Sequence, residues 1–206
     1  MGGLLALALV ARAPERISKL ALLATPWDFS EMPRSGIQHL RNSMPWLRSV
    51  IDATGVLPVD ILQAMFSGVD PCATARKFRQ FSSMASDRTS ARAFVQLEDW
   101  LNDGVPLSGP VAPECPQDWY IDNVTGNGRW QTGGAVVDLQ QFAMPTWVIV
   151  PENDVIVPPD TALPLGELMP NAKVSQLSSG HIGMIVGGKA KRQLYDPLAA
   201  WLLKAD

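Results

Sequence analysis

The chain has 206 residues, of which 47% are hydrophobic and 18% charged, and its formal net charge is −3. This composition fits a globular domain with a sizeable core and excludes a disordered or collagen-like chain. The mild acidic excess leaves no basic footprint for nucleic acid, and no apolar run reaches the roughly 18 residues of a membrane-spanning helix. Two cysteines, Cys72 and Cys115, are too few for a disulfide framework, so we expect a reducing, cytoplasmic location.

The chain opens with Met1, Gly2 and Gly3, and an apolar run over 4–11 follows them directly. A secretory signal peptide is one interpretation, because Ala-Arg-Ala at 11–13 resembles a cleavage site, but the stretch is short and has no positively charged start. The run favours instead a buried helix of about three turns that Pro14 ends. The glycines at its N-terminus would let the backbone approach a neighbour closely.

A second apolar run, 17–25, has the length of a strand and stops at Pro26. Its nearly continuous hydrophobicity is typical of a parallel strand that is covered on both faces. A helix followed by a strand is half of an α/β repeat, and such a repeat needs a strand ahead of the helix. We therefore expect a mostly parallel sheet whose N-terminal strands are missing from this chain.

The middle of the chain, 27–114, has the pattern of an all-helical insertion. Helical periodicity is found over 37–50, 58–66, 72–84 and 90–101, with turn residues between these ranges and no strand-length run of β-branched residues. Asp70-Pro71 predicts a helix start with Asp70 as the N-cap and Pro71 at the first helical position.

The α/β pattern resumes in the last segment, 115–206, as it began in 1–26. We expect strands at 145–150 and 173–177, a helix at 160–168, and a final helix at 190–204 with Trp201 and Leu202 facing inward. Glycine pairs near 126–128 and 133–134 are predicted to be turns, because they lack the Lys-Ser/Thr of a phosphate loop.

Two ionisable residues follow the two predicted strands of this segment. Asp154 follows the strand at 145–150, and His181 follows the strand at 173–177. Open α/β sheets carry their sites at the carboxyl ends of their strands, and an Asp followed by a His is the chain order of the last two members of an α/β-hydrolase triad. We predict Asp154 and His181 as catalytic residues. His39, inside the helical insertion, is predicted to be structural.

A nucleophile to complete this triad does not occur in the chain. The nucleophile elbow has the pattern G-x-S-x-G or its cysteine variant, and neither is present. Yet Met1-Gly2-Gly3 opening an apolar helix is what should follow such a nucleophile. We expect a Ser or Cys immediately ahead of Met1, with the Met1 backbone N–H in the oxyanion hole. Cys72 and Cys115 lack this strand-to-helix context.

Several segments together resemble the catalytic domain of polyhydroxyalkanoate synthases. Met1-Gly2-Gly3 matches the end of that family's G-x-C-x-G-G, 22–29 resembles L-L-A-T-P-x-D-F, and 99–104 is loosely similar to W-N-x-D-x-T. Further on, 137–139 matches V-D-L, 152–158 resembles E-D-H-I-V-P, and 179–182 matches S-G-H-I.

The resemblance implies a partial α/β-hydrolase fold with a helical cap at 27–114. It also implies an acyltransferase that takes the acyl group of a hydroxyacyl-CoA thioester onto a cysteine, with His181 as the base and Asp154 as its partner. Further implied are contact with a polyester granule surface and a homodimer. We predict no metal and no cofactor.

Departures from the family pattern keep other functions open. Val155 replaces the usual His after the Asp, and 183–188 replaces G-V-I-N-P-P. An α/β-hydrolase esterase or thioesterase would have the same features, as would a non-catalytic module that binds a granule or a partner. Without its nucleophile, the chain by itself is expected to be inactive.

Overall fold

The computed structural model describes residues 1–84 and 88–204 and divides into two compact units. One unit combines Met1–Ile37 with Asp118–Asp206, and we call it the sheet unit. The other, Gln38–Gln117, we call the helical unit. Both predicted site residues, Asp154 and His181, belong to the sheet unit.

The sheet unit is built on three parallel strands in the order β1-β6-β7. They are β1 (Leu20–Leu23), β6 (Thr146–Pro151) and β7 (Ala172–Leu177). Every residue of the central strand β6 is buried, as the continuous apolar run predicts for a strand covered on both faces. β1 is shorter than the predicted 17–25, because its pairing with β6 begins only at Leu20, opposite Thr146.

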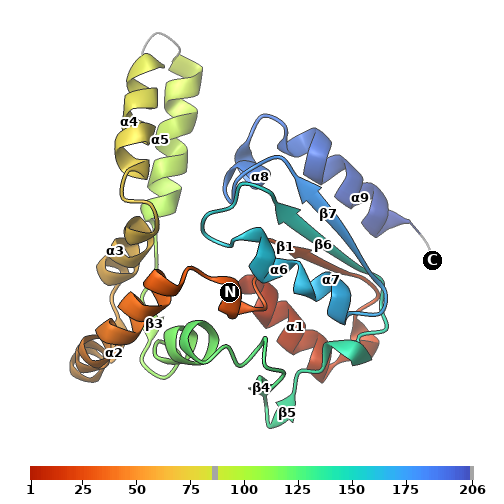
Figure 1. Ribbon diagram of the computed structural model, residues 1–206. Helices are drawn as coiled ribbons and strands as arrows, with labels where there is room; N and C mark the ends of the chain where they lie inside the picture. The colour runs from red at the N-terminus through yellow and green to blue at the C-terminus, as the bar shows by residue number, and fades with distance from the viewer. Residues whose placement is uncertain (85–87, 205–206) are drawn as a thin grey trace. The chain divides into compact units, whose positions relative to one another are not determined.

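Helices cover both faces of this sheet (Figure 1). On one side, Trp147 and Ile149 of β6 form a core cluster with Leu194, and Trp201 of α9 (Asp196–Leu203) packs against it. The other side carries α1 (Gly2–Arg12), α6 (Pro159–Ala162) and α7 (Pro164–Leu168). This parallel sheet between helices is the α/β architecture that the sequence predicts.

The helices of the sheet unit follow the predictions with three differences. The predicted helix at 160–168 is two helices, α6 and α7, with Pro164 at the start of the second. A short helix, α8 (Gly183–Val186), is not predicted. The final helix begins as a π-helical turn, η5 (Lys191–Tyr195), before α9. Leu202 does not face inward as expected, since it is 48% exposed.

Smaller elements complete the sheet unit. The predicted turn at 133–134 joins a two-stranded hairpin, β4 (Gln131–Thr132) and β5 (Ala135–Val136). Single turns lie at η1 (Pro14–Arg16), η2 (Phe29–Glu31) and η4 (Leu139–Gln141). A π-helical segment, η3 (Cys115–Ile121), begins in the helical unit and ends in the sheet unit.

The helical unit contains the four expected helices, the first of which begins before Gln38, in the last residues of the segment Met1–Ile37. They are α2 (Arg34–Thr54), which has Pro45 inside it, α3 (Val59–Val69), α4 (Ala73–Ser83) and α5 (Arg88–Asn102). The unit is not all-helical, because β2 (Val56–Leu57) pairs with β3 (Leu107–Ser108) in a two-residue antiparallel ladder. The start of α4 also differs from the prediction: Cys72 is the N-cap, and Asp70 accepts a hydrogen bond from the Cys72 backbone N–H.

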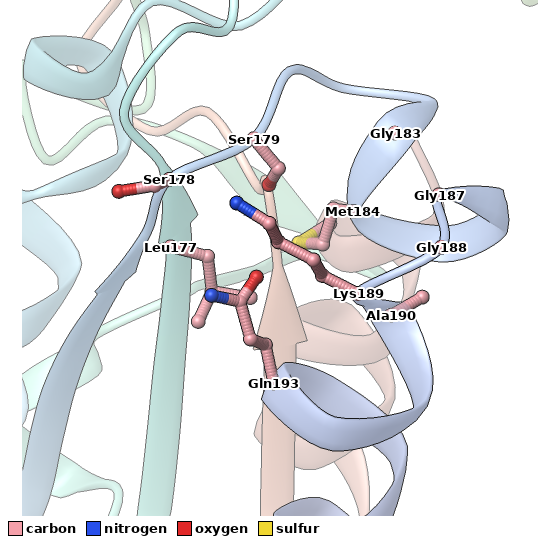
Figure 2. Close-up of a pocket in the computed structure, with 10 residues that line it drawn as sticks. All are labelled: Leu177, Ser178, Ser179, Gly183, Met184, Gly187, Gly188, Lys189, Ala190 and Gln193. Carbon is pink, nitrogen blue, oxygen red and sulfur yellow. The ribbon is translucent and has the colours of Figure 1, made fainter.

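A cavity of about 270 Å³ lies in the sheet unit just past the carboxyl end of β7 (Figure 2). Its lining includes Ser178 and Ser179, which lead into the loop that carries His181. None of the helices in the described ranges is both long and apolar enough to cross a membrane.

Candidate active site

Asp154 lies in the loop that leaves the central strand β6 and is almost completely buried, at 4% exposure. Its Oδ1 accepts hydrogen bonds from the backbone N–H groups of Ile156 and Val157, both at 2.9 Å. A buried carboxylate is tolerated only where hydrogen bonds replace its hydration. The loop at 154–157 therefore folds around the Asp154 side chain and fixes its orientation.

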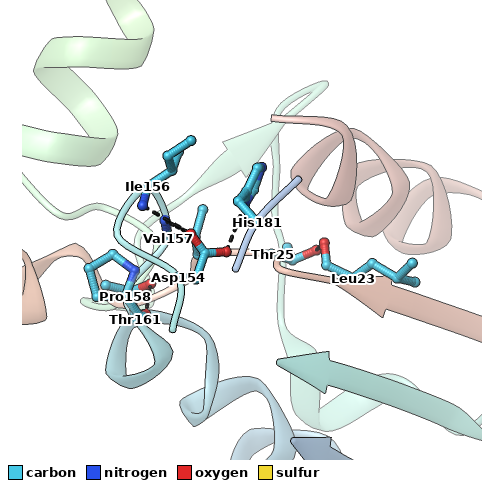
Figure 3. Close-up of polar contacts among 8 residues, drawn as sticks. All are labelled: Leu23, Thr25, Asp154, Ile156, Val157, Pro158, Thr161 and His181. Atoms are coloured by element: carbon cyan, nitrogen blue, oxygen red, sulfur yellow. Dashed lines mark hydrogen bonds and ion pairs between the residues drawn. The ribbon is translucent and has the colours of Figure 1, made fainter. Parts of the chain in front are cut away.

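His181 meets the second oxygen of the same carboxylate. The imidazole Nδ1 lies 2.7 Å from Asp154 Oδ2 (Figure 3). The Asp154 side chain has no exposure, whereas the His181 side chain is 32% exposed. The structure thus brings together the two residues that the sequence predicts as a pair, with the carboxylate on the inside and the imidazole toward the surface.

This arrangement has a definite chemical consequence. A carboxylate accepts but does not donate, so Nδ1 is the donor of the shared hydrogen bond. In the neutral ring, the other nitrogen, Nε2, carries the lone pair and is the atom that accepts a proton. Across the described parts of the chain, the His181 ring makes no second hydrogen bond. The pair can therefore act as a general base whose protonated form the buried carboxylate stabilises.

Hydrogen bonds link the loop after β6, which carries Asp154, to the loop after β7, which carries His181. The Ser178 hydroxyl donates to Glu152 Oε2 at 2.7 Å, and the Asn153 N–H donates to the Ser179 carbonyl at 3.0 Å. The loops thus continue the pairing of β6 with β7 beyond the last strand residues. Sequence reasoning missed this link, because a Glu and a Ser 26 positions apart have no recognisable spacing.

The start of α1 packs closely against the end of β1, at the same edge of the sheet. A Cβ on Gly3 would lie 2.0 Å from the Thr25 hydroxyl oxygen, so only glycine fits there. This is the close approach that the glycines predict. Met1 is the N-cap of α1, and its carbonyl accepts a hydrogen bond from the Leu5 N–H. The oxyanion-hole role of the Met1 N–H stays a prediction.

The remaining candidates lie in the other unit. His39, the exposed Cys72 and the buried Cys115 all belong to the helical unit, and neither cysteine forms a disulfide within the described residues. Within residues 1–84 and 88–204, no group of three His, Cys, Asp or Glu side chains is placed to hold a metal ion.

Comparison with known proteins links this chain to one fold family and one group of relatives. Residues 1–188 match the family model of the alpha/beta hydrolase fold. Poly(3-hydroxyalkanoate) polymerase subunits PhaC are similar over 98% of this chain: that of Haloferax mediterranei is 26% identical, and those of Synechocystis and Allochromatium vinosum are 27% identical. The chain covers 42%, 55% and 57% of these relatives, or about half their length.

Solved structures agree on the fold. An epoxide hydrolase of Bacillus megaterium superposes with a TM-score of 0.52 at 15% identity, over 97% of this chain and 65% of the other. Rv0554 of Mycobacterium tuberculosis gives a TM-score of 0.51 at 20% identity, over 97% and 62%. At these identities the superpositions carry the fold alone.

Proposed function

Because this chain belongs to the alpha/beta hydrolase fold family, we propose that it forms part of an acyltransferase acting on hydroxyacyl-CoA thioesters through a Cys-Asp-His triad. His181 is the general base and Asp154 its partner. The observation that carries the proposal is the 2.7 Å contact between His181 Nδ1 and the buried Asp154 carboxylate.

The substrate class rests on the relatives. The similar proteins are named poly(3-hydroxyalkanoate) polymerase subunits, and a polymerase of that kind handles hydroxyacyl groups. The match runs along nearly the whole of this chain, including both loops that hold the pair. We extend the hydroxyacyl thioester to this chain on that basis.

The proposed reaction proceeds in two steps. His181 Nε2 takes the proton of the cysteine thiol, and the thiolate attacks the thioester carbonyl. As the tetrahedral intermediate collapses, the C–S bond to CoA breaks, and the imidazolium returns its proton to the departing thiolate. The products are an acyl-cysteine and free CoA, and Asp154 stabilises the imidazolium between the two steps.

The nucleophile in this proposal is a cysteine directly ahead of Met1, as the family resemblance implies, with the Met1 N–H as an oxyanion-hole donor. Neither Cys72 nor Cys115 belongs to the unit that holds the pair. We accordingly propose that the 206-residue chain alone releases no CoA.

The helical unit has a proposed role of its own. We assign it as the cap of the site, with predicted bounds 27–114, where the compact unit runs from Gln38 to Gln117. A polyester granule surface and a second copy of the protein are the proposed partners. A cytoplasmic location belongs to the same proposal, since a reducing compartment disfavours disulfides and neither cysteine forms one within the described residues.

The test is CoA release from 3-hydroxybutyryl-CoA by the protein translated from the reading frame that continues upstream of Met1. Replacing the general base, His181→Ala, should lower the rate about a thousandfold, since a triad loses most of its power with one member. His39→Ala is the matched control and should leave the rate unchanged. Retained activity in His181→Ala would remove His181 from the mechanism.

Two further outcomes would select the alternatives. Faster turnover of simple carboxylic esters than of CoA thioesters would assign the site to an esterase. A stop codon directly upstream of Met1, together with no acyl transfer, would favour the non-catalytic binding module.

A further inference from the structure

The cavity past the end of β7 has an unusual charge balance. Ten residues line it, and among them Lys189 is the one charged side chain, with no Asp or Glu in the lining. The hydroxyl of Ser179 and the amide of Gln193 are the other side chains with strong hydrogen-bonding groups directed into it (Figure 2). A site with a cation, two neutral donors and no carboxylate suits an anion.

These polar groups have no partners within the described chain. The Ser179 hydroxyl oxygen is fully buried and makes no hydrogen bond there, and the structure gives no side-chain hydrogen bond or ion pair to Lys189 or Gln193 in residues 1–84 and 88–204. A buried hydroxyl left unpaired costs free energy, so a ligand that accepts its hydrogen bond is stabilised.

The neighbouring serine shows the contrast. Ser178 points away from the cavity in Figure 2, and its hydroxyl is engaged by Glu152. The Glu152 carboxylate therefore already accepts a hydrogen bond, and Glu152 is not among the residues that line the cavity. Of two adjacent serines, one braces the loops of the candidate active site and the other faces the cavity.

A close backbone approach shapes the wall opposite the serines. A Cβ on Gly187 would lie 2.4 Å from the carbonyl oxygen of Gly183, so the turn after α8 can fold back only because residue 187 is glycine. The turn brings Lys189 to the cavity. This turn lies where the sequence departs from the synthase pattern N-P-P, so the resemblance does not predict the cavity.

We propose that this cavity binds a phosphate group. Lys189 provides the charge, and the Ser179 hydroxyl and the Gln193 amide donate hydrogen bonds to the phosphate oxygens. The mouth of the cavity is open to solvent, so the phosphate can come from two sources. It is either inorganic phosphate or a phosphate ester group at the end of a larger molecule, as on the nucleotide half of a CoA thioester. For inorganic phosphate we expect a dissociation constant on the order of 1 mM.

The experiment is an NMR titration of the isotope-labelled 206-residue chain with inorganic phosphate, at constant ionic strength. Saturable shifts of the Ser179 and Gly188 amides are expected. Lys189→Met should weaken binding at least tenfold, and Ser179→Ala about threefold. Lys191→Met is the matched control: it removes the same charge two positions away, but Lys191 pairs with Asp196, so binding should not change.

A second arm separates the two sources of phosphate. Tighter binding of adenosine 3′,5′-bisphosphate than of inorganic phosphate identifies the ester, and weaker or equal binding identifies the free anion. If no saturable shifts appear at phosphate concentrations far above the expected dissociation constant, the proposal is overturned. Equal weakening in Lys189→Met and Lys191→Met would also overturn it, since binding would then follow net charge. Because neither Asp154 nor His181 is changed, this result is independent of the proposed acyl transfer.

Discussion

The helix that opens the sheet unit, α1, buries Leu4, Leu7 and Val10 to 1% exposure or less, whereas none of the described residues of α3, α4 and α5 in the helical unit is buried. The buried side chains of the helical unit lie elsewhere, on α2 and near it, and α4 and α5 meet through partly exposed side chains. Phe94 of α5 stacks on Phe81 and meets Phe78 edge-on, both from α4, and Lys77 pairs with Glu98.

The difference in burial between the two sets of helices bears on how firmly the candidate site residues are held. Asp154 follows β6, every residue of which is buried, and β7, which leads to His181, pairs with β6 along its whole length. The backbone pairing of the two strands therefore holds the two loops at one edge of the sheet. We expect helices that meet through partly exposed aromatic side chains, as α4 and α5 do, to open locally at lower free energy. The predicted pair of Asp154 and His181 thus lies on the sheet unit, and we expect α3, α4 and α5 of the helical unit to open more easily.

The sharpest test of this difference is a substitution that removes a buried side chain from the core of the sheet unit. Ile149 of β6 is 1% exposed. Ile149→Ala should lower the free energy of unfolding by about 3–4 kcal/mol, because the lost methyl groups leave a void between packed layers. Urea denaturation followed by circular dichroism measures the effect. A loss below about 1 kcal/mol would mean that this core is no better packed than the helical unit.

The matching change in the helical unit should cost less and stay local. Phe94→Ala removes two ring contacts, for which we expect about 1–2 kcal/mol. Hydrogen exchange should report faster opening of α4 and α5 with no change at β6. Val95→Ala, at a side chain 45% exposed in the same helix, is the control and should have almost no effect. If β6 amides exchange faster in Phe94→Ala, the two units are not independent in stability.

Substitutions of Ser178 and Ser179 compare a hydroxyl that links the two loops with a buried hydroxyl that has no described partner. Ser178→Ala loses the bond to Glu152 and should destabilise the chain by about 0.5–1 kcal/mol. Ser179→Ala removes a buried hydroxyl that has no described partner, so it should be neutral or stabilising. Urea midpoints of the two variants provide the measurement, and equal losses would contradict the assigned roles.

The smallest expected effect is electrostatic. Burial, and then the nearby Asp122, raise the pKa of Asp118. A raised pKa means that the protonated form is favoured in the fold, so its contribution to stability is present below the ordinary Asp pKa and is lost as the pH rises through the raised value. Asp118→Asn should therefore unfold at a higher temperature than the unchanged chain at pH 7.

The pH dependence of that difference provides the check. The gap in melting temperature between Asp118→Asn and the unchanged chain should close as the pH falls below the ordinary Asp pKa, since both side chains are then neutral. A gap that does not depend on pH would show that the cause is packing and not charge.

Much of the fold could be predicted because local patterns and tertiary demands coincide. The apolar run at 4–11 with Pro14 behind it predicts α1, and the continuous apolar run at 145–150 predicts β6. Asp154 and His181 are predictable as a pair for a related reason: residues just after parallel strands meet at one edge of the sheet. Their roles as base and partner stay a prediction.

Other features depend on contacts that no local pattern contains. The length of β1 is set by where β6 begins to pair with it, and the exposure of Leu202 by which side of α9 the core cluster takes.

By itself, the sequence determined the order and type of the main elements and the two residues at the carboxyl ends of β6 and β7. Hydrophobic periodicity and strand-end position suffice for both, because each is local to a segment. Only the tertiary structure decided that one Asp154 oxygen accepts backbone N–H groups while the other meets His181. It likewise decided which serine hydroxyl links the two loops and where the cavity with Lys189 lies. Those features depend on distances between side chains from separate segments, and packing alone brings such segments together.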